Sequence, residues 1–240
     1  MARYRSMARQ TLPPASAACW SVALCCAWFC TIAGSVAAAP FTIYSDETSF
    51  TAALSNRWNN TFSGVPSGVR PNPSTFSGAG TVSGSFTYSG TASGGLYLWP
   101  AGTPGPALTT LAGNQNLFFT TFSSDVQGFG GRFWVADFND GTVIPSRTVS
   151  LTLTFSDATT GTTSAVVSGT NTFLGIVVDP SATVTQARLS QPGSTGMTTA
   201  AGQVIVGTAV PEPSTLVIAA AAAAMLGWRA CRRRHRPEGG

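Results

Sequence analysis

The chain has 240 residues and a formal net charge of +4, and only 9% of its residues are charged. The positive charge belongs to the two ends, because residues 40–209 hold five arginines and seven acidic residues. A body with this balance lacks the basic face that nucleic acid binding requires, which excludes nucleic acid as a partner. The same residues contain no cysteine, histidine or lysine, which excludes disulfides, thiolate metal sites and histidine catalysis from the body.

Residues 1–38 form a predicted signal peptide. Three arginines in the first nine residues precede an apolar stretch from about residue 15 to residue 36, and small residues follow it before Pro40. This order of charge, apolar run and small residues is typical of a secretory signal that signal peptidase removes. The run is also long enough to span a bilayer, so an uncleaved membrane anchor is the alternative interpretation.

The body, residues 39–209, opens with a predicted strand and helix. In "FTIYSDETSFTAAL", Phe41 and Ile43 alternate with polar residues, and Asp46 then takes a helix N-cap position with Glu47 in the first turn. We expect a short helix over residues 47–54. From about residue 61 onward, Gly, Ser, Thr and Pro separate short apolar runs, a pattern that is typical of an all-β domain.

The clearest strand is predicted over residues 148–155. There, apolar residues at 149, 151, 153 and 155 alternate with Ser and Thr, which predicts that one face of the strand is buried and the other is exposed to solvent. A turn cluster follows, and the next residues read as the returning strand of a hairpin. About nine strands of this kind predict a mostly β fold with a single β-sandwich domain.

The end of the chain combines three features in a set order. Pro211, Glu212 and Pro213 come first, an apolar run of 13 residues up to Trp228 comes next, and a cluster of arginines follows. As a helix the run would measure about 20 Å, which is short of the hydrocarbon core of roughly 30 Å. We therefore expect a marginal membrane anchor, formed mainly by Leu216, Val217, Ile218, Met225, Leu226 and Trp228. The predicted cytoplasmic basic tail consists of Arg229, Arg232, Arg233, Arg234 and Arg236.

This segment, residues 210–236, resembles the PEP-CTERM sorting signal, in which motif, hydrophobic helix and basic end occur in this order. The resemblance implies export through the general secretion machinery, transient anchoring in the inner membrane, and processing by an exosortase. It also implies association with extracellular polysaccharide at the cell surface, as in a biofilm matrix. The body is similar to the jelly-roll sandwiches found in such proteins.

Two features of the body are candidate binding sites. Asp137, Asn139 and Asp140 have oxygen ligands at a spacing that partly matches a calcium loop, although a turn between strands explains the same residues without a metal. Aromatic residues could instead form a platform on which sugar rings stack, or they could belong to the core. The candidates for such a platform are Tyr97, Trp99, Trp134 and Phe138.

The sequence contains no nucleophile turn, phosphate loop or metal-ligand cluster in the body, so we predict a protein without catalytic residues or a cofactor. Two functions stay open. The favoured one is a structural component of the surface or exopolysaccharide matrix, and the alternative is a carbohydrate-binding or adhesive module.

We predict that the mature protein at the cell surface is cleaved between residues 211 and 215 and has lost its arginines. The short anchor would hold the chain only until the exposed motif is processed. Intact-mass analysis of surface protein measures this directly. A dominant species that still ends at Gly240 would contradict the prediction.

Overall fold

A computed structural model describes residues 41–100, 105–179, 181–193 and 196–210. The predicted signal peptide and, from Pro211 onward, the predicted sorting motif, membrane anchor and basic tail lie outside the described residues. Within the described part of the chain, no helix is long and apolar enough to cross a membrane.

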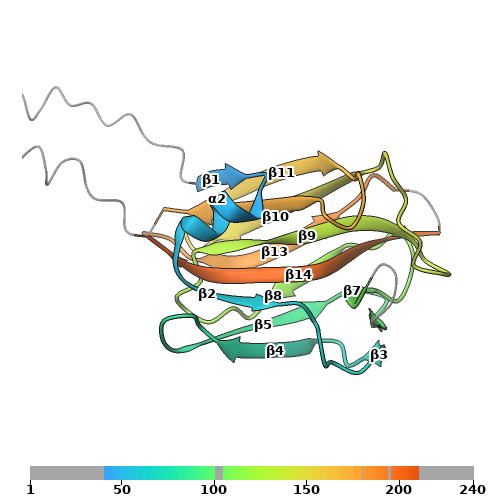
Figure 1. Cartoon of the computed structure of the whole chain (residues 1–240), viewed down its shortest axis with the longest axis horizontal. Helices are drawn as coiled ribbons and strands as arrows, with labels where there is room; N and C mark the ends of the chain where they lie inside the picture. The colour runs from blue at the N-terminus through green and yellow to red at the C-terminus, as the bar shows by residue number, and fades with distance from the viewer. Residues whose placement is uncertain (1–40, 101–104, 180, 194–195, 211–240) are drawn as a thin grey trace, which may run out of the picture. The chain divides into compact units, whose positions relative to one another are not determined.

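Two antiparallel sheets form the body (Figure 1). The first sheet has the order β1 (Phe41–Tyr44), β12 (Phe173–Val178), β9 (Gly128–Asp137), β14 (Met197–Ala209), β7 (Ala107–Thr110), β6 (Leu96–Trp99) and β3 (Gly68–Arg70), and β2 (Leu54–Asn60) also pairs with β14. The second sheet has the order β11 (Thr160–Val166), β10 (Thr148–Phe155), β13 (Val184–Ser190), β8 (Leu117–Thr120), β5 (Ser85–Thr91) and β4 (Ser74–Ala79).

Eight of these strands have the connectivity of a jelly roll. The pairing β2-β14-β9-β12 occurs in the first sheet and β8-β13-β10-β11 in the second, so that the chain crosses between sheets as in two linked Greek keys. The strands from β3 to β7 are inserted between β2 and β8 and widen both sheets. The predicted mostly β sandwich is therefore confirmed.

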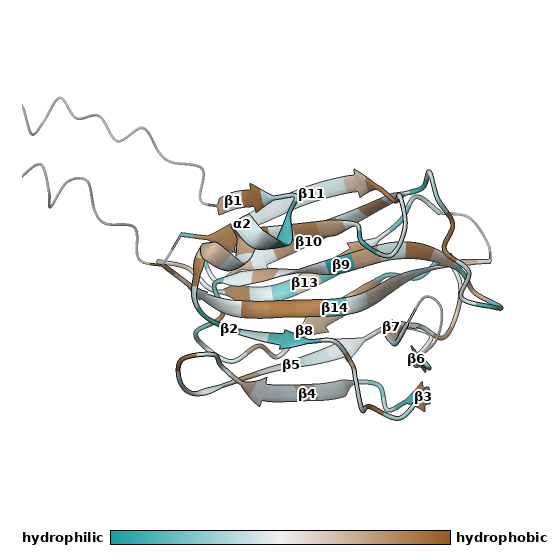
Figure 2. Cartoon of the chain, in the orientation of Figure 1, coloured by the Kyte–Doolittle hydropathy of each residue, from teal (hydrophilic) through white to brown (hydrophobic). Residues whose placement is uncertain are grey.

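The main core lies between the two sheets. Along β10, residues 149, 151, 153 and 155 are buried while the Ser and Thr residues between them stay partly exposed, which confirms the predicted alternation. Strand β14 is different, because most of its residues are buried on both faces, and Figure 2 shows a long hydrophobic stretch along it. Its sequence is not a continuous apolar run, because Gln203 separates Ala200 and Ala201 from the apolar residues 204–206.

A second, smaller core lies on the outer face of the first sheet. Helix α2 (Glu47–Ala52) covers this face, and its Phe50 is completely buried against β9 and β12. The floor beneath the ring is made of glycine: a Cβ on Gly175 would lie 2.6 Å from Cδ2 of Phe50, and a Cβ on Gly130 would lie 3.0 Å from its Cζ. Larger residues here would lift the helix from the sheet. The glycines therefore set the position of α2 and of Glu47 at its start.

The helix and several strands differ in extent from the prediction. The Asp46 side chain accepts a hydrogen bond of 2.8 Å from the Ser49 backbone N–H, which confirms the expected N-cap. The helix ends at Ala52 and not at residue 54, because Leu54 already begins β2. Fourteen strands occur in the described residues, against about nine predicted. The missed ones include β2, β3, β4 and β7, which are short or polar and lack a clear period of two.

The two ends of the body lie at the same end of the first sheet. The register places Phe41 opposite Val178, Val177 opposite Gly128, and Gly128 opposite Gly207. The beginning of β1 and the last residues of β14 therefore lie at the same end of the sheet, with β12 and β9 between them. The loops that follow Asp137 and precede Met197 lie at the opposite end.

We predict that Leu153→Ala destabilises the fold by about 2–5 kcal/mol, because it leaves a cavity in the main core. Thr152→Ala, on the outer face of the same strand, should cost a few tenths of a kcal/mol. Urea unfolding of both variants, followed by circular dichroism, measures the difference. Equal effects would show that β10 is not buried on one face only.

Candidate functional site

The outer face of the first sheet carries two hollows lined by residues from several strands. The smaller one, called here the aromatic pocket, has a volume of about 210 Å³. Its lining consists of Tyr97, Trp99, Thr109, Thr110, Leu111, Phe138, Asn139 and Asp140. The larger one, called here the polar groove, has a volume of about 580 Å³ and is lined mainly by polar side chains near α2 and the middle of β14.

The pleat of β6 determines the floor of the aromatic pocket. Leu96 and Leu98 are completely buried between the sheets, so Tyr97 and Trp99 project from the outer face and are partly exposed. The loop after β9 lies against the indole of Trp99, where a Cβ on Gly141 would be 3.2 Å from its Cε2. Gly141 has a φ of +76°, a conformation that glycine adopts without strain.

The same loop brings Asn139 and Asp140, two of the three candidate calcium residues, into the lining of the aromatic pocket. Oδ1 of Asp137 accepts hydrogen bonds from the backbone and side-chain nitrogens of Asn139, at 2.8 and 3.1 Å. Oδ1 of Asp140 accepts a bond of 2.8 Å from the backbone N–H of Thr142, which lowers the pKa of Asp140. These contacts are those of a turn. No group of three or more His, Cys, Asp or Glu side chains that could hold a metal occurs among the described residues.

Trp134 does not join the other aromatic residues of the predicted platform. It projects from β9 on the outer face but is only 2% exposed, so it presents no ring face to a sugar. A β-bulge in β14 places Gly202 against it, and a Cβ there would collide with the indole. Trp134 instead lies in the lining of the polar groove. The platform is therefore reduced to Tyr97, Trp99 and Phe138.

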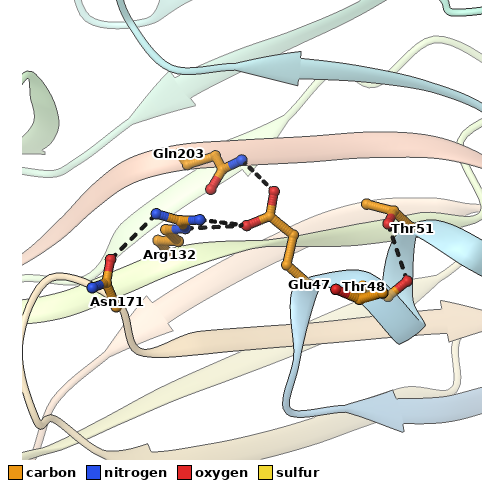
Figure 3. Close-up of polar contacts among 6 residues, drawn as sticks. All are labelled: Glu47, Thr48, Thr51, Arg132, Asn171 and Gln203. Carbon is orange, nitrogen blue, oxygen red and sulfur yellow. Dashed lines mark hydrogen bonds and ion pairs between the residues drawn. The ribbon is translucent and has the colours of Figure 1, made fainter.

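A hydrogen-bonded network of four side chains lies in the polar groove (Figure 3). Oε2 of Glu47 accepts from Nε and Nη2 of Arg132 at 3.1 and 2.9 Å, and its Oε1 accepts from Nε2 of Gln203 at 2.9 Å. Nη1 of Arg132 also donates to Oδ1 of Asn171 at 3.2 Å. The four residues come from α2, β9, β14 and the loop before β12, so only the tertiary fold brings them together.

Sequence reasoning missed this network, and one signal could have indicated it. Arg132 interrupts the strand "GFGGRFWVAD", in which the other residues before Asp137 are buried. An exposed arginine between buried neighbours marks the place where the outer face of the strand meets solvent, and its charge favours an acidic partner nearby. The identity of the partner, 85 residues earlier in the chain, carries no local signal.

The point where the body ends is held by contacts from two segments, residues 53–55 and the loop before β9. The backbone N–H of Ala209 donates to Oε1 of Gln127 at 2.9 Å, and that of Val210 donates to the carbonyl oxygen of Ala53 at 2.9 Å. The hydroxyl of Ser55 lies 3.1 Å from the carbonyl oxygen of Ala209. The chain therefore leaves the folded body at a defined place.

Residues 209–234 match the model of the PEP-CTERM protein-sorting motif. The chain carries the sorting motif of exosortase substrates. The match begins at Ala209, which is the last residue of β14, so the PEP-CTERM segment follows the folded body directly. This motif marks the protein as exported, anchored in a membrane and then processed.

Comparison with other proteins adds little about the body. No curated protein matches the chain. Among solved structures, the enzymatically active domain of tailspike protein 4 from bacteriophage CBA120 is similar at 10% identity with a TM-score of 0.24. That match covers 65% of this chain and 20% of the tailspike chain. A similarity of this extent carries no argument about function.

We predict that EDTA and a thiol reductant leave the melting temperature of the protein unchanged. Oδ1 of Asp137 and Oδ1 of Asp140 already accept hydrogen bonds within the turn, and the body has no cysteine. Differential scanning calorimetry with and without EDTA measures this. A fall of several degrees that added calcium reverses would identify the turn as a metal site.

Proposed function

We propose that this protein is an exported, non-catalytic structural component of the cell surface or exopolysaccharide matrix, delivered by an exosortase. The observation that carries the proposal is the direct connection between β14 and the sorting motif. β14 pairs with β9, β2 and β7, so the sandwich is complete only when the residues next to the motif have been exported. Folding and processing then take place on the outer side of the inner membrane.

The arrangement of the chain ends supports this proposal. Because β1 begins and β14 ends at the same end of the first sheet, both targeting segments attach to one end of the body. The body would be held at that end while anchored and would present the loops of the other end outward. Signal peptidase, the general secretion machinery and the exosortase are the partners that this sequence of events requires.

Four of the seven acidic residues of the body are held in turns that lower their pKa, which supports a role without catalysis at these four positions. Backbone N–H donors from Ser49, Thr142 and Ser181 lower the pKa of the aspartates that cap their turns. The Thr159 hydroxyl does the same for Asp157. A general acid that works near neutral pH needs a raised pKa, so these shifts have the wrong direction for that role.

The aromatic pocket supports carbohydrate binding as a second function. Tyr97 and Trp99 offer apolar ring surface, and Asn139 and Asp140 stand beside them with amide and carboxylate groups for sugar hydroxyls. The loop that carries these polar groups follows Asp137, at the end of the sheet away from the two chain ends. An anchored protein would present this pocket outward.

Trp99→Ala tests the two functions against each other. If the pocket binds glycans, the variant should lose binding on a glycan array, because the ring contributes most of the apolar contact. Phe118→Ala is the matched control, since Phe118 is a partly exposed aromatic residue on the second sheet. Its binding should equal that of the wild type.

The structural role predicts a different result. Glycan binding, if any, would then be the same in Trp99→Ala as in the wild type, and the wild type would remain in the polymer fraction of the cell surface only when its tail is intact. Fractionation of cells that express the full chain or a chain ending at Val210 measures this. Equal retention of both chains would contradict sorting by the tail.

A further inference from the structure

We propose that the polar groove binds a neutral sugar residue through a pair of adjacent hydroxyl groups. The proposal concerns a different site from the aromatic pocket and depends on hydrogen bonding and not on ring stacking. It can hold whether or not the aromatic pocket binds glycans.

The charges of the groove cancel. Glu47 and Arg132 form the one ion pair found in the described residues, and their side chains are 30% and 45% exposed, within reach of a ligand. Three of the five N–H groups of Arg132 are used by Glu47 and Asn171, which leaves two for a ligand. Each carboxylate oxygen of Glu47 also has acceptor capacity left. The pair therefore offers donors and acceptors side by side without net charge.

Adjacent sugar hydroxyls match this arrangement. Each hydroxyl donates one hydrogen bond and accepts others, so it can donate to Glu47 while it accepts from Arg132. Hydrogen bonds to charged groups are stronger than those between neutral groups. Gln203 and Asn171 hold the two charged side chains in place before a ligand arrives, which lowers the entropic cost of binding.

The surroundings of the pair are polar at the rim and apolar at one wall. Asn59, Thr61 and Ser63 contribute amide and hydroxyl groups along one side. The indole of Trp134 lines the groove, and its buried Nε1–H has no partner among the described residues. A buried donor without a partner is uncommon in folded proteins. The indole therefore contributes a mostly buried apolar wall, and the polar contacts of a ligand come from the ion pair and the rim.

An acidic ligand fits the groove less well. Its carboxylate would approach Arg132 beside the carboxylate of Glu47, which already occupies the guanidinium through two hydrogen bonds. Repulsion between the two negative groups opposes this binding. The groove is thus selective for neutral sugars because of Glu47.

Titration of the full chain in detergent micelles tests the proposal. The neutral probes are methyl α-mannoside, methyl β-galactoside and methyl β-glucoside. Methyl glucuronide and sodium acetate are the acidic probes. Saturation-transfer NMR measures the binding of each probe. We expect saturable binding of at least one neutral glycoside and weaker binding of both acidic probes. Absence of saturable binding by all three neutral glycosides would overturn the proposal.

Glu47→Gln gives the sharpest result. It removes the negative charge but keeps an oxygen acceptor, so affinity for the neutral glycoside should fall by at least about tenfold while affinity for acetate and glucuronide rises. Asp157→Asn removes a carboxylate from the turn between β10 and β11 and should change neither affinity. Unchanged affinities in Glu47→Gln would contradict the proposal.

Two further variants distinguish the polar groove from the aromatic pocket as the place where the glycoside binds. Asn171→Ala leaves the ion pair intact and removes only a neighbouring amide, so it tests the groove if Glu47→Gln folds poorly, and we expect weaker glycoside binding. Trp99→Ala should leave the binding of these glycosides unchanged. Loss of binding in Trp99→Ala together with normal binding in Asn171→Ala would place the ligand in the aromatic pocket and overturn the proposal.

Discussion

The position of β14 in the middle of the first sheet is the constraint on which the rest of the structure depends. This strand of 13 residues pairs with β9 along most of its length, and its other edge is shared between β7 and β2. The last part of the folded chain thus completes its central sheet. A protein built in this way cannot form its core until almost the whole body has been exported, and the sorting motif follows within one residue of that core.

The shared edge of β14 also creates the polar groove. Where the pairing changes from β7 to β2, the bulge at Gly202 shifts the register, and Gln203 then stands opposite Arg132 on the outer face. Helix α2 lies on the adjoining glycine floor and brings Glu47 to the same place. β-Bulges often reorient side chains next to functional sites. The groove, the ion pair and the buried indole of Trp134 therefore have a common structural origin.

The outer face of the first sheet and that of the second differ in chemical character. The second sheet presents Thr and Ser side chains from β10 and β11, whose residues pair directly across the hairpin. The first sheet is partly covered by α2 and by the loop after β9, and the aromatic pocket and the polar groove are found there. The outer face of the second sheet is dominated by hydroxyl groups, with Phe118, Gln186 and Arg188 beside them.

The sequence by itself determined the class of the fold, the alternation in β10, the cap of α2 and the sorting motif. Each of these depends on residues close together in the chain, where period, turn chemistry and residue order act directly. Tertiary structure alone decided that Trp99 lies in a pocket while Trp134 is buried, and that Glu47 meets Arg132. Both outcomes depend on strand order and on the β14 bulge, which join residues that are far apart in the sequence. Pairing between distant strands leaves no local pattern in the sequence, because the partner of each strand depends on the order of all the strands in the sheet.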